Sequence, residues 1–95
     1  MKVKPSVKFI HCRNKNQDGS ISPQGGLTIA YTLNEKFKVV GWAAARCNDK
    51  DIYNKHIGRA KSAGRLLSDK WYQDCPEIDE KSFIQQSQDG YAKAF

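Results

Sequence analysis

Five side chains of this 95-residue sequence have the chemistry to hold zinc or to act as nucleophile and base. They are His11, Cys12, Cys47, His56 and Cys75. Structural zinc needs four ligands in a tetrahedron, which usually arrive as two closely spaced pairs. His11 and Cys12 are the one close pair, and their spacing is wrong for zinc. We therefore expect no metal and no other cofactor. The odd number and wide spacing of the cysteines predict reduced thiols.

A cysteine nucleophile is the second kind of chemistry to consider. Cys47 precedes a predicted helix, whose N-terminal dipole would favour the thiolate form. Catalysis also needs a base within hydrogen-bond reach of the sulfur, and His56, nine residues further on, is predicted to point into the core. Phosphate-binding loops, dinucleotide-binding glycine patterns and paired carboxylates do not occur in the sequence. We therefore expect a protein that is not an enzyme, in which Cys47 is a packing residue.

Four bases between residues 55 and 65 have the spacing of one helical face. They would form a stripe about 15 Å long at the rise of an α-helix, and arginine at two of the four positions suits contacts to phosphate or carboxylate. The target can be nucleic acid or the acidic groove of a protein. Tryptophans are available to stack on bases or to pack against a partner. The predicted partner-binding residues are Lys55, Arg59, Lys61, Arg65, Trp42 and Trp71.

The charge of the chain supports an anionic partner. The formal net charge is +6, the composition is 39% hydrophobic and 27% charged, and the distribution is uneven. Residues 1–16 carry five bases and no acid, whereas residues 71–95 carry five acids and two bases. Such asymmetry favours an anionic partner for the earlier part of the chain, although a merely soluble surface would look similar.

Alternating residues predict three antiparallel strands that would carry this helix. Residues 27–33 and 37–46 alternate with period two on either side of a short polar break at residues 34–36, which is typical of a β-hairpin. Residues 7–12 suggest an earlier strand, joined to the hairpin by a loop that contains an Asp18-Gly19 turn signal. The order along the chain predicts a three-stranded meander.

The helix is predicted from about Lys50 to Ser68. Asn48 would be its N-cap, Asp51 would complete a capping box, and Cys47 with Ile52 would form the flanking staple. At about 100° per residue, the predicted core face holds Ile52, Tyr53, His56, Ile57, Ala60, Ala63, Gly64 and Leu67. The small residues on that face would allow close approach to the sheet.

The opposite face of this predicted helix is basic. Besides the four bases it holds Gly58 and Ser62, with Leu66 as the one exception. Gly58 is either an ordinary position or a point where the backbone of a partner comes close.

The C-terminal part predicts an edge element and a second helix. Residues 69–76 are expected to form a loop or a short edge strand. Asp79 is a predicted N-cap with an Ile78–Phe83 staple, and Asp89-Gly90 is typical of a helix end. The fold class is therefore α+β, one domain over residues 1–95, with the three-stranded sheet packed by one amphipathic helix and a short C-terminal helix. A bare sheet face with Val40 and Trp42 would favour a homodimer.

No stretch approaches the roughly 18 apolar residues of a membrane helix. Lysines are interleaved with the apolar residues of the first ten positions, unlike a signal peptide. A cytoplasmic protein without a membrane partner is expected.

The run CNDKDIYNKHIGRAKSAGRL at residues 47–66, after the strand GGLTIAY at residues 25–31, resembles small accessory proteins of bacteriophages and mobile elements. The resemblance covers residues 25–67. It implies a non-catalytic viral inhibitor or adaptor in the host cytoplasm, of the anti-CRISPR kind. Such a protein would dock its basic helix face on a host defence or nucleic-acid-processing complex. Direct binding of nucleic acid or a nucleotide is the alternative. No family residues carry over, so Arg59 and Arg65 are candidates on physical grounds alone.

Overall fold

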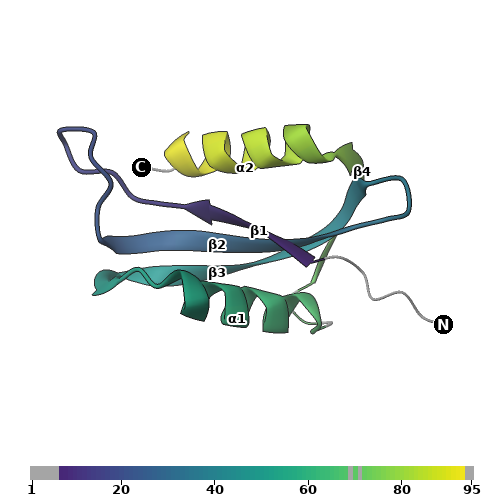
Figure 1. Cartoon of the computed structure of the whole chain (residues 1–95), viewed down its shortest axis with the longest axis horizontal. Coiled ribbons are helices and arrows are strands. Elements are labelled where there is room, and N and C mark those ends of the chain that lie inside the picture. The colour runs from purple at the N-terminus through teal and green to yellow at the C-terminus, as the bar shows by residue number, and fades with distance from the viewer. Residues whose placement is uncertain (1–6, 69, 71, 94–95) are drawn as a thin grey trace.

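A four-stranded antiparallel sheet between two helices makes up the fold. The computed structural model describes residues 7–68, 70 and 72–93. The elements along the chain are β1 (Val7–Cys12), β2 (Gln24–Leu33), β3 (Lys38–Ile52), α1 (Lys55–Leu66), β4 (Gln73–Asp79) and α2 (Glu80–Lys93). The strands lie in the order β1-β2-β3-β4, and Figure 1 shows α1 on one side of the sheet and α2 on the other. The α+β class is confirmed.

The predicted count of three strands is wrong, because β4 adds a fourth. Residues 73–79 pair with the first part of β3, where Lys38 lies opposite Asp79 and Trp42 opposite Gln73. Of the two alternatives for residues 69–76, a loop or a short edge strand, the structure shows the edge strand, which continues to Asp79. Pro76 and several charged residues occur in it. These are features that edge strands commonly carry.

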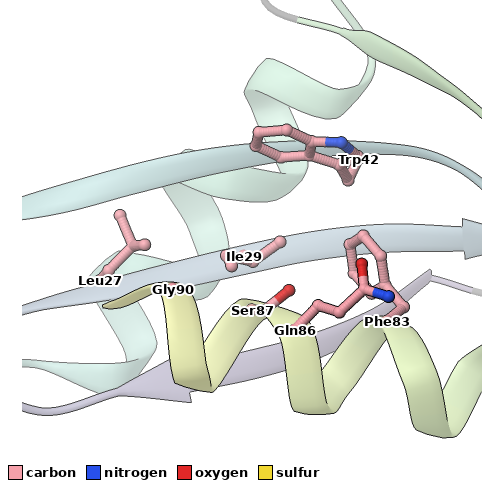
Figure 2. Close-up of a pocket in the computed structure, with 7 residues that line it drawn as sticks. All are labelled: Leu27, Ile29, Trp42, Phe83, Gln86, Ser87 and Gly90. Atoms are coloured by element: carbon pink, nitrogen blue, oxygen red, sulfur yellow. The ribbon is translucent and has the colours of Figure 1, made fainter. Parts of the chain in front are cut away.

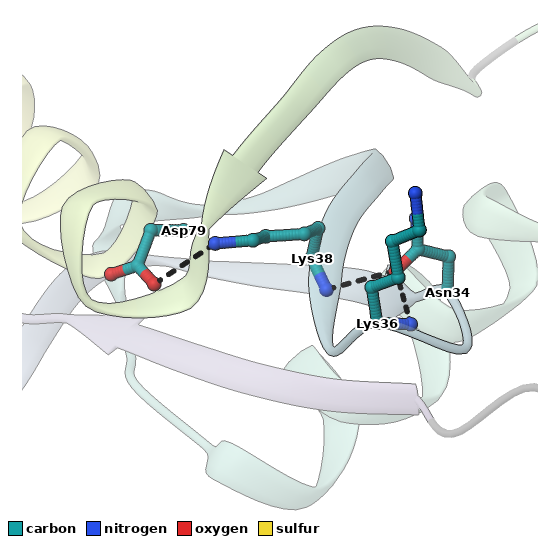
Figure 3. Close-up of polar contacts among 4 residues, drawn as sticks. All are labelled: Asn34, Lys36, Lys38 and Asp79. Atoms are coloured by element: carbon teal, nitrogen blue, oxygen red, sulfur yellow. Dashed lines mark hydrogen bonds and ion pairs between the residues drawn. The ribbon is translucent and has the colours of Figure 1, made fainter.

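The predicted hairpin is confirmed and is formed by β2 and β3. Its turn is organised by Asn34, whose Oδ1 accepts hydrogen bonds from the backbone N–H groups of Lys36 and Lys38, each at 3.0 Å (Figure 3). Phe37 closes the turn with a φ of 61°. This value lies in the left-handed region, which residues other than Gly, Asn and Asp seldom adopt. The expected turn at Asp18-Gly19 is also present, with Gly19 at a φ of 88°.

The two faces of the sheet differ in the size of their side chains. The face under α2 buries a cluster of large residues, Ile10, Cys12, Ile29, Tyr31 and Val39 with Phe83 of α2. The face under α1 is lined by smaller ones, among them Thr28, Ala30, Ala43 and Ala45, all at most 5% exposed. The main hydrophobic core therefore lies between the sheet and α2. The small side chains of the other face allow α1 to approach the sheet closely.

Polar contacts fasten the first turn of α2 and the end of β4 to the rest of the sheet. Tyr31 Oη donates a hydrogen bond to Glu80 Oε2 at 2.7 Å, and Lys8 Nζ lies 3.3 Å from the same oxygen. Lys38 Nζ lies 3.5 Å from Asp79 Oδ1 (Figure 3). The Tyr31 hydrogen bond is the largest factor that lowers the pKa of Glu80. The helix starts where the sequence predicts, but it continues to Lys93, so the expected end at Asp89-Gly90 is wrong.

The start of α1 differs from the prediction. β3 continues to Ile52, and the helix begins at Lys55 with Asn54 as N-cap, whose Oδ1 accepts a hydrogen bond from the Ile57 N–H at 3.1 Å. Asn48 instead lies within β3 and accepts a hydrogen bond from the N–H of Lys50 at 2.9 Å. The predicted cap, capping box and staple at residues 47–52 are therefore wrong.

The predicted faces of α1 are wrong too. The residues that face the sheet are Gly58, Ser62 and Leu66, and Ser62 and Leu66 are buried. Of the predicted core face, Tyr53 is buried and Ala63 is half-buried, while Ile52, His56, Ile57, Ala60, Gly64 and Leu67 are exposed. None of the helices in the described ranges has the length and apolar character needed to cross a membrane.

Candidate functional site

The side of α1 that faces away from the sheet carries an apolar strip with bases beside it. Ile57 is 50% exposed and Leu67, the C-cap residue, is 82% exposed. Ala60 and Gly64 lie between them, and both are exposed. The spacing of these four residues places them within about 80° of one another on the helix, opposite the buried Ser62. We call Ile57, Ala60, Gly64 and Leu67 the outer strip.

The four predicted bases do not form a single stripe. Gly58, Ser62 and Leu66, which face the sheet, run along α1 between Arg59 on one flank and Lys61 and Arg65 on the other. Lys55 is in the first turn, on the side of Arg59. This division arises because α1 packs on the sheet through part of the face that the sequence predicted to be exposed.

The two flanks meet different strands. Lys55 and Arg59 lie near β1, close enough to lower the pKa of His11. Arg65 is half-buried and donates from Nη1 to the carbonyl oxygen of Ala44 in β3 at 2.9 Å. Arg65 therefore helps to hold α1 on the sheet, whereas Lys55, Arg59 and Lys61 are exposed and form no ion pair within the described part of the chain.

The two tryptophans of the predicted site are not on this surface. Trp42 points to the opposite face of the sheet, beneath α2, where it packs against the main core cluster. That face is not bare, so the expectation of an uncovered sheet face around Trp42 is wrong. Trp71 lies outside the described residues. The predicted site residues thus lie in separate places. The four bases are on α1, and Trp42 is on the face of the sheet that α2 covers.

A second group of residues lies beside Lys55, and the sequence did not predict that its members come together. His11 Nδ1 lies 2.7 Å from the Tyr53 hydroxyl oxygen, and that oxygen lies 2.7 Å from Thr28 Oγ1. The guanidinium carbon of Arg13 lies 4.3 Å from the centre of the Tyr53 ring, a cation–π geometry. Gly26, with a φ of 119°, leaves room for this ring, since a Cβ there would lie 2.7 Å from Tyr53 Cδ2.

This group is cationic. Burial lowers the pKa of His11, and the nearby charges of Lys55, Arg59 and Arg13 lower it further. Alternation in the sequence puts His11 and Phe9 on one face of β1, whereas the register that sets His11 opposite Thr28 is given by the structure. We call Arg13, Lys55 and Arg59, with His11 between them, the basic cluster.

The cysteines show no arrangement for catalysis. Cys47 lies in β3, well before α1, so the expected helix dipole does not act on it. Its Sγ lies 3.6 Å from the Asp51 carbonyl oxygen. Burial raises the pKa of the Cys12 and Cys75 thiols, which disfavours the thiolate. His56, expected in the core, is exposed on α1. No group of three metal-ligating side chains comes together in the described ranges.

An apolar pocket lies between α2 and the sheet. It is lined by Leu27, Ile29 and Trp42 from the strands and by Phe83, Gln86, Ser87 and Gly90 from α2, with a volume of about 290 Å³ (Figure 2). The sequence gives one sign of it in the spacing of Phe83, Ser87 and Gly90, which puts one large and two small residues on the inner side of the helix.

No protein-family model, curated protein or solved structure matches this chain.

Proposed function

We propose that the protein is a non-enzymatic binding protein that docks the outer strip of α1, with the bases beside it, on an acidic surface of another protein. The observation that carries this proposal is the exposure of Ile57 and Leu67 on a helix that already packs on the sheet through its other side. Exposed apolar side chains grouped on one surface are typical of protein interaction sites.

The composition of the surface supports a protein partner. The outer strip supplies an apolar centre, and the exposed residues Lys55, Arg59 and Lys61 supply a polar rim. Protein interfaces have this anatomy, in which a desolvated apolar core is surrounded by charged residues that remain in contact with water. The small residues Ala60 and Gly64 in the centre would allow a partner element to approach the helix axis closely.

The charge supports an acidic partner rather than a second copy through this surface. Residues 54–68 contain four bases and no acid. Acids near the C-terminal end of the chain contact other groups on the α2 side, where Glu80 lies beside Lys8 and Asp79 beside Lys38. Two copies that met through α1 would bring like charges together, at a cost in binding free energy.

Replacement of Ile57 by Asp tests the proposal. The variant should lose stable association with the protein partner of the wild type, because it puts a carboxylate at the centre of an apolar contact. The matched control is Ile21→Asp, since Ile21 is 60% exposed and belongs to the loop between β1 and β2. The readout is co-purification from host lysate, followed by calorimetric titration of the isolated partner with each variant.

A host defence or nucleic-acid-processing complex, which the sequence resemblance implies, is the first partner to titrate. A partner that binds wild type and both variants with equal affinity would refute the proposed surface. The same holds for a partner whose contact surface is basic.

Direct binding of nucleic acid is a second candidate, supported by the basic cluster. Lys55 and Arg59 of α1 and Arg13 of the loop after β1 converge near His11. If phosphates bind there, Lys55→Glu with Arg59→Glu should abolish a gel shift whose affinity falls steeply with salt. Ile57→Asp should leave that gel shift in place, which separates this function from the first. Lys61→Glu, on the other flank, is the matched charge control.

A further inference from the structure

We propose that the basic cluster binds a phosphate monoester, such as a nucleoside monophosphate or the terminal phosphate of a nucleic-acid strand, and that His11 Nε2 donates a hydrogen bond to it. The inference rests on the second candidate function in one respect, since both need an anion to bind at these residues. It goes further because it names the group that binds and the contact that His11 makes. The outer strip of α1 has no part in it.

The hydrogen bonds of His11 determine which ring nitrogen carries the proton. Nδ1 lies 2.7 Å from the Tyr53 hydroxyl oxygen and 3.3 Å from Thr28 Oγ1, and these two oxygens lie 2.7 Å apart. Thr28 has no exposed surface and Tyr53 is 9% exposed, so both hydroxyl protons need an acceptor. Each proton finds one within this group only if Nδ1 accepts a hydrogen bond. The proton of the neutral ring is therefore on Nε2.

The Nε2 atom of His11 is available to a ligand. It forms no hydrogen bond with any residue in the described ranges, and the His11 side chain is half-buried rather than enclosed. The other ring nitrogen holds the ring in one orientation through Tyr53. A fixed N–H donor without an acceptor in the protein is suited to an oxygen of a bound anion.

The first two turns of α1 place two cations beside this histidine. A Cβ at Gly58 would overlap Thr28 Oγ1, so the backbone of α1 touches the residue whose hydroxyl lies next to His11 Nδ1. Arg59 follows directly, and its Nε donates to the carbonyl oxygen of Lys55 at 3.4 Å. This hydrogen bond turns the guanidinium of Arg59 towards the start of the helix, where Lys55 lies. Both side chains are exposed.

Arg13 approaches the same group from the loop after β1. Its guanidinium carbon lies 4.3 Å from the centre of the Tyr53 ring, whose hydroxyl contacts His11. Nη2 donates to the carbonyl oxygen of Ser22 at 3.2 Å, whereas Nη1 has no hydrogen-bond partner among the described residues. The Arg13 side chain is thus held in position with one amino group that can contact a ligand.

The protein itself does not neutralise these cations. Lys55, Arg59 and Arg13 all act to lower the pKa of His11, and no carboxylate of the described residues acts in the opposite direction. Lys55 also occupies the first position of α1, where the helix dipole favours acids, and the first turn contains no acid. Like charges gathered in this way repel one another in the folded protein. Departures from local rules are typical of functional sites, and an anionic ligand would remove this repulsion.

Charge and geometry favour a phosphate monoester among the possible anions. A monoester carries about 1.5–2 negative charges near pH 7, whereas a phosphodiester or a carboxylate carries a single charge. The cations of the basic cluster can balance the larger charge. The outer oxygens of a monoester can accept hydrogen bonds from the imidazole N–H, the guanidinium groups and the ammonium group at the same time.

An NMR titration of the two histidines tests the inference in the full-length protein. Above the pKa of His11, the nitrogen resonances of its ring should show the proton on Nε2. Saturating uridine monophosphate, compared with chloride at equal ionic strength, should raise the pKa of His11 by about 1, because a nearby anion favours the imidazolium. His56, which is exposed on α1, is the internal control and should change much less.

Two double variants that remove the same charge identify the site. Lys55→Gln with Arg59→Gln should weaken binding of uridine monophosphate by about tenfold or more, because most of the positive charge around His11 is lost. Lys61→Gln with Lys81→Gln, at exposed positions of α1 and α2, should change it by less than about twofold. Circular dichroism checks that each variant is folded, and Arg13→Gln replaces the first double variant if that one is not.

A dinucleotide with and without a terminal phosphate separates the monoester from the phosphodiester. The phosphorylated form should bind about tenfold more tightly, because only this form carries the second negative charge. If its affinity equals that of uridine monophosphate, the free nucleotide is a sufficient ligand. A higher affinity would identify the end of a strand as the ligand.

Equal binding of the two dinucleotides would overturn the inference, as would a pKa of His11 that does not rise with uridine monophosphate. Equal losses of affinity in the two double variants would have the same meaning. Failure of the second candidate function is a different result, because it concerns the gel shift of longer nucleic acid. A gel shift with equal binding of the two dinucleotides supports that function alone, and a preference for the monoester without a gel shift supports the inference alone.

Discussion

Single residues on the inner side of α1 decide how closely the helix approaches the sheet. A Cβ at Gly58 would overlap Oγ1 of Thr28, a residue with no exposed surface. Ser62 is also fully buried, and its hydroxyl donates to the carbonyl oxygen of Gly58 at 2.7 Å, which satisfies the polar group within the helix. The close approach at Gly58 is therefore made by the protein's own strand β2, and not by a partner as one reading of the sequence suggested.

Two glycine substitutions in α1 should have opposite effects on stability. Gly58→Ala should lower the free energy of unfolding by about 1–3 kcal/mol, because the added methyl group overpacks the contact with Thr28. Gly64→Ala should raise it by about 1 kcal/mol, because alanine favours the helix and the added Cβ would meet no described atom within 4 Å beyond its chain neighbours and the backbone of α1. Urea unfolding followed by circular dichroism measures both. Equal stabilities of the two variants would contradict the packing of α1 on β2.

His11 should make stability depend on pH. Burial, with the charges of Lys55, Arg59 and Arg13, lowers the pKa of His11 below its ordinary value of 6.5. Below pH 6.5 the unfolded chain therefore binds a proton that the folded chain binds less readily. The stabilisation is complete above about pH 6.5 and is lost as the pH falls towards the lowered pKa of the folded state.

We expect the free energy of unfolding, measured in urea, to fall between pH 7 and pH 5. The pKa of Glu80 is lowered from 4.5, so its own effect on stability lies at lower pH. His11→Gln should flatten the profile, and His56→Gln, at an exposed position of α1, should not. An unchanged profile in His11→Gln would mean that other groups cause the pH dependence.

At the scale of elements, the sequence predicts the strands well and the helix α1 poorly. Alternation finds β2 because large residues on the face under α2, such as Ile29 and Tyr31, alternate with smaller ones on the face under α1, such as Thr28 and Ala30. In α1 the apolar residues face solvent, since the alanine-lined sheet face accepts the small residues Gly58 and Ser62 instead. Leu66, the one residue that did not fit the predicted basic face, marks the buried side. Apolar periodicity therefore identified the helix but assigned its buried side wrongly.

The predicted start of α1 is wrong because the same short sequence pattern occurs both at helix N-caps and in turns. An Asn followed by polar residues can cap a helix or accept a hydrogen bond two residues on in a turn. Asn48 does the latter within β3, and Asn54 does the former. The same error placed Cys47 at a helix end.

Alanine at the two asparagines should distinguish these roles. Asn54→Ala should lower the free energy of unfolding by about 1 kcal/mol, the usual effect of a lost N-cap. Asn48→Ala should have a smaller effect, because its hydrogen bond closes an exposed local turn. Thermal and urea unfolding of both variants provide the comparison. A larger loss in Asn48→Ala would place the helix start there.

At the scale of the whole molecule, the uneven charge of the chain becomes a difference between its two sides. Asp79 of β4 contacts Lys38 of β3, and Glu80 of α2 contacts Lys8 of β1. Glu77 accepts a hydrogen bond from Asn34 at 2.9 Å. The exposed bases of α1 lie on the opposite side of the sheet (Figure 1). Charge counts along the sequence predict an anionic partner but cannot show this separation, which depends on α1 and α2 packing on opposite faces of the sheet (Figure 1).

The unequal attachment of α2 has a consequence for its motion. The first turn is fixed by Tyr31, Lys8 and the packing of Phe83, whereas the second half stands above the apolar pocket. Local opening costs least where few buried contacts must break. Amide hydrogens after Ser87 should therefore exchange with deuterium faster than those at Phe83 and Ile84, as NMR or mass spectrometry can measure. Uniform protection along α2 would show that the helix opens only as a unit. It would contradict local unfolding of its C-terminal half.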